Sequence, residues 1–255
     1  MECGQRTSAP DSSVPIIIRC RAVFLRIRWP ILAMALLALI MGCDDGESAA
    51  PAAGNLFGNP GFEDGRDPWF SLKPPDFTVS TDVAHSGGAS ALLPLAADKS
   101  EEGIKIIYLV QEVKPRELPA VIAGYYRVEN WNKGTKKQYL QFVVIVFGAD
   151  NLPGGFVNHQ IRYLLSGVEA PPFAIGNAHF VFLSRDDPPI GEWVPFQRNL
   201  REDFEKFWGA VPENFEHIRV LFEVRYDDKD IGEGPLAADV YYDDLYLGPA
   251  PSPQR

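Results

Sequence analysis

The chain has 255 residues and a formal net charge of −10, because 34 Asp and Glu outnumber 24 Lys and Arg. Five of the arginines and two of the acids precede Cys43, so the rest of the chain carries a net charge of −13. This excess of acid argues against a nucleic-acid partner, because phosphate contacts need clustered positive charge.

The first 43 residues have the pattern of an export signal. Basic residues from Arg19 to Arg28 precede an apolar run at 31–41, and Gly42-Cys43 follows. An apolar run of this length is typical of a secretory signal and is too short to span a bilayer. The ending Leu39-Ile-Met-Gly-Cys43 resembles a bacterial lipobox, although Met41 is an uncommon residue at its position.

These features predict a bacterial lipoprotein. We expect a signal peptide over 1–42, lipidation of Cys43, and a flexible tether over 43–54 that holds the protein at a membrane of the cell envelope, either in the periplasm or at the cell surface. The alternative is ordinary cleavage nearby, with Cys43 incidental. The other cysteines, Cys3 and Cys20, lie in the same leader, so a disulfide-stapled scaffold or thiolate metal site after Cys43 is excluded.

The segment Asn55-Leu-Phe-Gly-Asn-Pro-Gly-Phe-Glu-Asp-Gly65 is rich in turn residues. Pro60 fixes φ and the glycines allow positive φ, so Phe62 and Glu63 are expected in a bent segment. Trp69 follows at once. The opening of the folded domain is therefore predicted to be a turn with one aromatic and one carboxylate side chain fixed in it.

Short stretches with alternating or continuous apolar residues follow, separated by Pro- and Gly-rich loops. We expect strands over Phe77–Val83, Ala91–Leu95, Ile104–Val113, Ala120–Val128, Tyr139–Phe147, His179–Leu183, Trp193–Leu200, His217–Tyr226 and Asp239–Leu247. The residues from Gly148 to Ala178 are expected to form a long excursion. One helix is predicted over Arg201–Trp208, whose aromatic stripe would cap an open end of the fold.

This spacing of strands predicts an all-β sandwich over 55–248, with a disordered tail over 249–255. Three motifs then point to a family. The opening turn, the hairpin at 84–93 with its His85-Ser-Gly, and the last strand Val240-Tyr-Tyr-Asp-Asp-Leu-Tyr-Leu247 together resemble galactose-binding-like carbohydrate-binding modules of the cellulose- and xylan-binding types. The resemblance implies a jelly-roll β-sandwich that binds polysaccharide, with catalysis left to a separate domain.

The same resemblance implies structural Ca²⁺ bound by Glu63 of the opening turn and Asp243 of the last strand. Period-two alternation places Asp243 on the same face as Leu245 and Leu247, and an isolated buried carboxylate is costly. Calcium prefers all-oxygen sites of this kind. The alternative is that both carboxylates accept backbone N–H bonds without any ion.

Successive residues of a strand point to opposite faces of the sheet, so even- and odd-numbered positions can be assigned to separate faces (their parity). In three of the predicted strands, one face is apolar and the other combines Tyr rings with Arg, Glu and Gln. Flat rings and planar polar groups suit sugars, which present C–H faces and vicinal hydroxyls. The predicted ligand-binding residues are Tyr125, Arg127, Trp131, Tyr139, Gln141, Arg219, Glu223 and Arg225. The alternative is a ladder of salt bridges on an ordinary solvated face.

Trp131 is included because it stands in the polar turn Asn130-Trp-Asn-Lys-Gly134, where we expect an exposed ring. No Gly-x-Ser-x-Gly, His-Glu-x-x-His or phosphate-binding glycine loop is present, so no catalytic residues are assigned. The sequence predicts a non-catalytic, envelope-anchored lipoprotein that binds carbohydrate. The second hypothesis is a structural or protein-interaction lipoprotein on the same scaffold.

Overall fold

The structure, a computed structural model, describes residues 54–250. The predicted signal peptide, the lipidation site Cys43, the tether up to residue 53 and residues 251–255 of the tail lie outside this range. Within residues 54–250, the helix is neither long nor apolar enough to cross a membrane.

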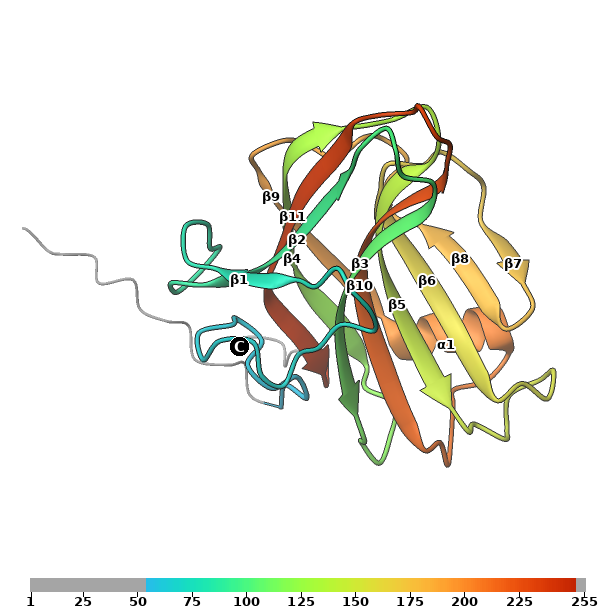
Figure 1. The fold of residues 1–255 in the computed structure, drawn as a ribbon. Coiled ribbons are helices and arrows are strands. Elements are labelled where there is room, and N and C mark those ends of the chain that lie inside the picture. The colour runs from blue at the N-terminus through green and yellow to red at the C-terminus, as the bar shows by residue number, and fades with distance from the viewer. Residues whose placement is uncertain (1–53, 251–255) are drawn as a thin grey trace, which may run out of the picture. The chain divides into compact units, whose positions relative to one another are not determined.

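The described residues form two mostly antiparallel sheets packed face to face (Figure 1). The five-stranded sheet has the order β1 (Thr78–Ser80), β2 (Ser90–Ala97), β11 (Leu236–Gly248), β4 (Val121–Asn132) and β9 (Trp193–Asn199). The six-stranded sheet has the order β3 (Gly103–Val113), β10 (His217–Lys229), β5 (Gln138–Phe147), β6 (Asn158–Ser166), β8 (Ala178–Phe182) and β7 (Phe173–Ile175). The predicted all-β sandwich with one short helix is confirmed.

The core lies between the two sheets and is rich in aromatic rings. Phe222 of β10 and Tyr242 of β11 meet across it with ring centroids 5.1 Å apart, and Phe142 of β5 meets Phe196 of β9 at 5.0 Å. Alternate residues of β4, β5 and β10 point inward, so the parity assignments made from sequence for these strands are correct. Each fully buried Phe contributes about 1.5–3 kcal/mol to the free energy of unfolding.

Helix α1 (Leu200–Trp208) closes one side of the sandwich, as predicted. Asn199 caps it by accepting the Glu202 N–H, and Gly209 ends it in the left-handed conformation. Phe204 is fully buried, and the Trp208 ring lies edge-on against His179 of β8 with centroids 4.5 Å apart. The helix also contacts β9, so its aromatic stripe fills the gap between the edges of the two sheets.

The segment after Phe147 differs from the long excursion predicted from the sequence. It contains β6, which pairs with β5 inside the six-stranded sheet, and the short edge strand β7. In β6, Ile161, Tyr163 and Leu165 point into the core, but the buried Leu164 beside them blurs the alternation in the sequence. The strand was therefore not recognised.

A second correction concerns β11, where strict alternation fails. A bulge between Asp243 and Tyr246 shifts the register against β4. Before the bulge Val240 and Tyr242 face the core, whereas after it Leu245 and Leu247 do. Asp243 therefore does not share a face with Leu245, because it pairs with the outward Tyr125 of β4.

The opening turn lies along the last strand, as its motif predicts. The Asn55 side chain donates to the Leu245 carbonyl over 2.8 Å and accepts the Leu247 N–H over 3.0 Å. The Leu245 N–H donates to the Pro60 carbonyl over 3.1 Å. Phe62, buried and at a φ of 62°, packs its ring 5.4 Å from that of Trp69. The two ends of the domain are thereby joined.

Candidate functional site

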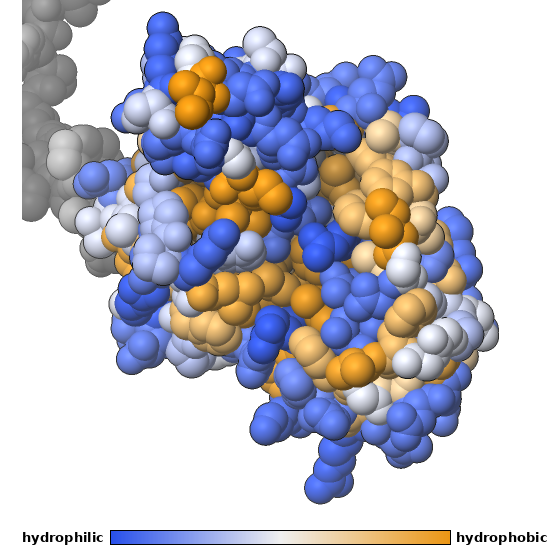
Figure 2. Space-filling model, turned by 45° about the vertical axis from the view of Figure 1, so that its right-hand side comes forward, coloured by the Kyte–Doolittle hydropathy of each residue, from blue (hydrophilic) through white to orange (hydrophobic). Residues whose placement is uncertain are grey.

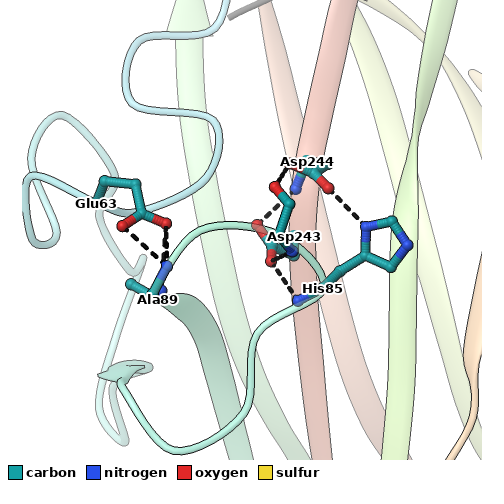
Figure 3. A network of polar contacts seen from close by, with 7 residues as sticks. Glu63, His85, Ala89, Asp243 and Asp244 are labelled. Atoms are coloured by element: carbon teal, nitrogen blue, oxygen red, sulfur yellow. Dashed lines mark hydrogen bonds and ion pairs between the residues drawn. The ribbon is translucent and has the colours of Figure 1, made fainter. Parts of the chain in front are cut away.

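Glu63 fixes the turn between β1 and β2 to the opening segment (Figure 3). Its carboxylate accepts the N–H of Gly88 over 2.9 Å and the N–H of Ala89 over 3.2 Å. A Cβ placed on Gly87 would overlap this carboxylate at 2.1 Å, so glycine is required for the close approach. Glu63 thus acts as a brace between two loops.

Asp243 braces the same turn from the last strand (Figure 3). Its carboxylate accepts the N–H of His85 over 2.7 Å, that of Ser86 over 3.2 Å and that of Asp244 over 2.7 Å. The turn covers the group completely, and this burial raises the pKa of Asp243 to about 6 despite the three donors. Asp244 adds contacts to the same turn through His85 and Ser86.

These contacts match the alternative to a calcium site, in which both carboxylates accept hydrogen bonds from backbone N–H groups without an ion. Oδ2 of Asp243 already accepts two donors, and Oδ1 accepts one. Within residues 54–250 no three His, Cys, Asp or Glu side chains are grouped as a metal site. Calcium also binds backbone carbonyls, so the ion stays a prediction.

The predicted ligand-binding residues do not share one surface, which corrects the sequence analysis. Tyr125 and Arg127 belong to β4 in the five-stranded sheet. Tyr139, Gln141, Arg219, Glu223 and Arg225 belong to β5 and β10 in the six-stranded sheet. Both groups point away from the core, so they lie on opposite outer faces of the sandwich.

On the five-stranded sheet, Tyr125 forms part of a small aromatic cluster. Its ring stacks on His85 with centroids 3.6 Å apart, and Trp193 meets the same His85 edge-on at 5.5 Å. Arg127 is bound to Glu129 over 2.6 Å in the same strand. The cluster holds the 84–89 turn to the sheet, so its aromatic rings have a structural role.

Trp131 does not form an exposed platform. It lies within β4, not in a turn, and its partly buried ring packs against the core. The strand continues to Asn132, four residues beyond the predicted end, so the polar turn begins only after the ring. The prediction of an exposed loop-tip ring is wrong.

The outer face of the six-stranded sheet buries a second apolar cluster, separate from the core. This support cluster consists of Val110, Val143, Ile145 and Leu221, whose exposed fractions are 0–8%. Tyr108 and Phe147 pack against it. An ordinary solvated face carries polar residues at such positions. The outer layer of rings and guanidinium groups therefore rests on a packed, rigid base.

We call that outer layer the platform. It consists of Tyr108, Phe147, Arg162, Phe180, Arg219 and Arg225. Figure 2 brings the side of β5–β8 forward and shows a hollowed area where hydrophobic and hydrophilic surfaces alternate. Arg219 lies 5.3 Å from the Phe147 ring centroid and Arg162 lies 5.6 Å from that of Phe180.

Ion pairs hold two of the platform arginines. Arg219 is bound to Glu112 of β3 over 2.5 Å, and Arg225 to Asp227 of its own strand over 2.5 Å. Tyr139 donates to the same Asp227 over 3.0 Å. The salt-bridge alternative is thus partly correct, although with Glu112 and Asp227 as partners instead of Glu223 or Glu129.

Glu223 and Gln141 lie beneath the platform at the centre of the sheet. Both are buried, and the Gln141 amide donates to the Glu223 carboxylate. Burial raises the pKa of Glu223, and the hydrogen bond from Gln141 and the charges of Arg162 and Arg225 oppose this rise. Oε1 of Gln141 has no partner within the described residues, so the pair retains one free acceptor.

Tyr108, Phe147, Arg162 and Phe180 were missed by the sequence analysis. Arg162 lies in the unrecognised β6, and Tyr108 of β3 belongs to a strand whose parity was not sorted. Sorting β3 against β10 would have found it, because Tyr108 pairs with Glu223.

An open pocket of about 410 Å³ beside Asp227 adjoins this end of the sheet and is lined by Lys133, Lys136 and Lys137 among others.

No protein-family model and no curated protein matches the sequence. Similar solved structures include TmCBM61 in complex with beta-1,4-galactotriose, at 16% identity and a TM-score of 0.41, covering 76% of this chain and 97% of that one. A xylan-binding domain of CBM 22 matches at 12% identity and a TM-score of 0.40, covering 78% and 97%. The enzymatically active domain of a bacteriophage CBA120 tailspike protein matches at 10% and 0.38, covering 76% and 21%. At these identities and scores the likenesses assign no function to this chain.

Proposed function

We propose that this protein is a non-catalytic, envelope-anchored lipoprotein whose β-sandwich binds carbohydrate on the platform of the six-stranded sheet. One observation carries the proposal. The platform's rings and guanidinium groups stand on a buried aliphatic layer outside the core, which a purely solvated sheet face does not need.

The chemistry of the platform fits a sugar. Tyr108 and two stacked pairs of rings, Phe147 with His217 and Phe180 with Phe173, offer apolar surface to the C–H face of a pyranose ring. The guanidinium groups of Arg219 and Arg225 offer planar donors to neighbouring hydroxyls, and their ion pairs fix these donors in place. A rigid platform loses little conformational entropy on binding, so more of the contact energy appears as affinity.

Anchoring rests on the leader and on Cys43. Lipidation of Cys43 would hold the domain at a membrane while the tether leaves the platform free to reach a polysaccharide. The absence of a catalytic motif in the sequence supports a binding role without turnover.

The test is affinity electrophoresis and calorimetry of the full chain against neutral and acidic polysaccharides. Tyr108→Ala and Phe180→Ala should each weaken binding about fivefold or more, because each removes apolar ring surface from the platform. The matched control is Tyr125→Ala, which removes a ring from the opposite outer face and should leave affinity unchanged. Equal losses in all three variants, or no binding by wild type, would refute the proposal.

The second candidate is a protein-interaction lipoprotein without sugar binding. It is favoured by β7, the edge strand of the six-stranded sheet, where Phe173 and Ile175 are 39% and 65% exposed. Exposed apolar edge strands are sites of strand pairing with other chains. Retention of partner binding by wild type and its loss in Ile175→Lys, with no polysaccharide bound, would favour this candidate.

A further inference from the structure

Arg162 differs from the two other arginines of the platform because no carboxylate is bound to it. Arg219 and Arg225 each form an ion pair at 2.5 Å, whereas Arg162 forms none with the described residues. Its one side-chain hydrogen bond runs from Nη2 to Oε1 of Gln160 over 3.0 Å. In a domain with a large excess of acid, a half-buried guanidinium paired only with a neutral amide is unexpected.

The amide that holds Arg162 is itself fixed. Gln160 donates through Nε2 to Oδ1 of Asn158 over 3.0 Å, and Asn177 donates to the same Oδ1 over 2.6 Å. This chain of amides turns the Gln160 carbonyl toward Arg162. The guanidinium is therefore oriented without being neutralised, and most of its five N–H donors stay free.

The surroundings of Arg162 favour a ligand from the platform side. Val143 of the support cluster is its register partner in β5, and Phe180 is its partner in β8. The nearest acid of the sheet centre, Glu223, is buried and directed at Gln141, and its burial disfavours the ionised form. The platform consequently carries one guanidinium group that forms no ion pair with the described residues.

We propose that the carbohydrate bound by this protein carries carboxylate groups, as uronic-acid polysaccharides do, and that Arg162 binds one such carboxylate through its planar fork of N–H donors. This inference rests on the proposed carbohydrate-binding function. Contact with the stacked rings of Phe173 and Phe180, whose centroids lie 4.4 Å apart, places a sugar ring beside the guanidinium, and the ion pair then selects sugar rings that bear an acid.

The experiment compares each acidic polymer with its own neutral form. The full chain is titrated with polygalacturonate and with alginate, and with the same polymers after chemical reduction of their carboxyl groups. We expect at least one acidic polymer to bind about tenfold or more tightly than its reduced form. That preference should weaken as ionic strength rises, because an exposed ion pair is screened by salt.

Two variants locate the preference. Arg162→Gln should remove the preference for the acidic polymer, while affinity for the reduced polymer changes less than about twofold. Arg162→Lys should restore part of the preference, since it keeps the charge without the fork. Arg201→Gln, which removes an arginine of α1 bound to Glu117, is the matched control and should leave the preference intact.

The outcomes separate the two proposals. Equal binding of acidic and reduced polymers, or a preference that survives in Arg162→Gln, would overturn the inference and leave carbohydrate binding intact. Failure of every polymer to bind would overturn both. Equal melting temperatures of wild type and Arg162→Gln exclude misfolding as the cause of a lost preference.

Discussion

The brace formed by Asp243 predicts an unusual dependence of stability on pH. Its carboxyl group is fully buried beneath the 84–89 turn, and burial raises its pKa to about 6 from an ordinary 3.8. Asp243→Asn keeps the size and shape of the side chain but removes the titrating proton. The comparison between wild type and this variant therefore isolates the titration of one group.

The sign and size of the effect follow from linkage. Below about pH 3.8 the group is protonated in both the folded and the unfolded chain, so its full contribution to stability is present. Between that pH and about 6 the unfolded chain loses the proton first, so the free energy of unfolding of wild type falls as pH rises. The difference in pKa corresponds to about 3 kcal/mol.

The assay is urea unfolding of wild type and Asp243→Asn from pH 3.5 to 7.5 in the presence of a chelator, which excludes metal binding. The free energy of unfolding of wild type minus that of the variant should fall by about 2 kcal/mol between pH 4 and pH 6 and become level above about pH 7. Asp239→Asn, at a partly exposed position of the same strand, controls for loss of a charge. A difference that is constant, or that grows with pH, would refute the burial argument.

Three further predictions concern the core, the brace and the leader. Phe204→Ala should lower the free energy of unfolding by about 3–5 kcal/mol, because it leaves a cavity where α1 meets the sheets; a loss below about 1 kcal/mol in denaturant titrations would contradict this packing. If calcium binds between Glu63 and Asp243, a chelator should lower the melting temperature and Glu63→Ala should abolish that shift; an unchanged melting curve would count against the ion. Cys43→Ser should move the protein from the membrane fraction to the soluble fraction of bacteria that express the full chain, and unchanged fractionation would exclude a lipid at Cys43.

Much of the fold follows from local sequence patterns. Period-two alternation identified the inward residues of β4, β5 and β10, because each of these strands has one face on the core. The spacing of Phe204, Phe207 and Trp208 identified α1 and its buried stripe. The turn residues around Pro60 identified the opening segment, which the structure places along the last strand.

The errors arise where information from outside the strand is needed. Parity shows which residues of β4 share a face, but not that β4 pairs with β11 and β9 instead of with β5 and β10. The predicted site was therefore divided between two sheets. The bulge at Asp243 reverses the alternation within one strand, and it is stabilised by the distant 84–89 turn.

Because β6 was not predicted from the sequence, Arg162 was not recognised as a residue of the site. A half-buried arginine points to a ligand site only when it is known whether a carboxylate pairs with it. The neighbours of Arg162 lie on β5, β6 and β8. The sequence shows its charge but not the absence of a paired carboxylate. The contrast with Arg219 and Arg225 appears only after the strands are placed side by side.

Methyl NMR tests the central claim most directly, namely that carbohydrate binds over the support cluster. The full chain, labelled at Ile, Leu and Val methyl groups, is titrated with the polysaccharide of highest affinity. The account predicts that the signals of Val143, Ile145 and Leu221 shift with saturation, while that of Leu92 on the opposite outer face stays in place. Saturable binding that shifts Leu92 and leaves the support cluster unchanged would contradict it.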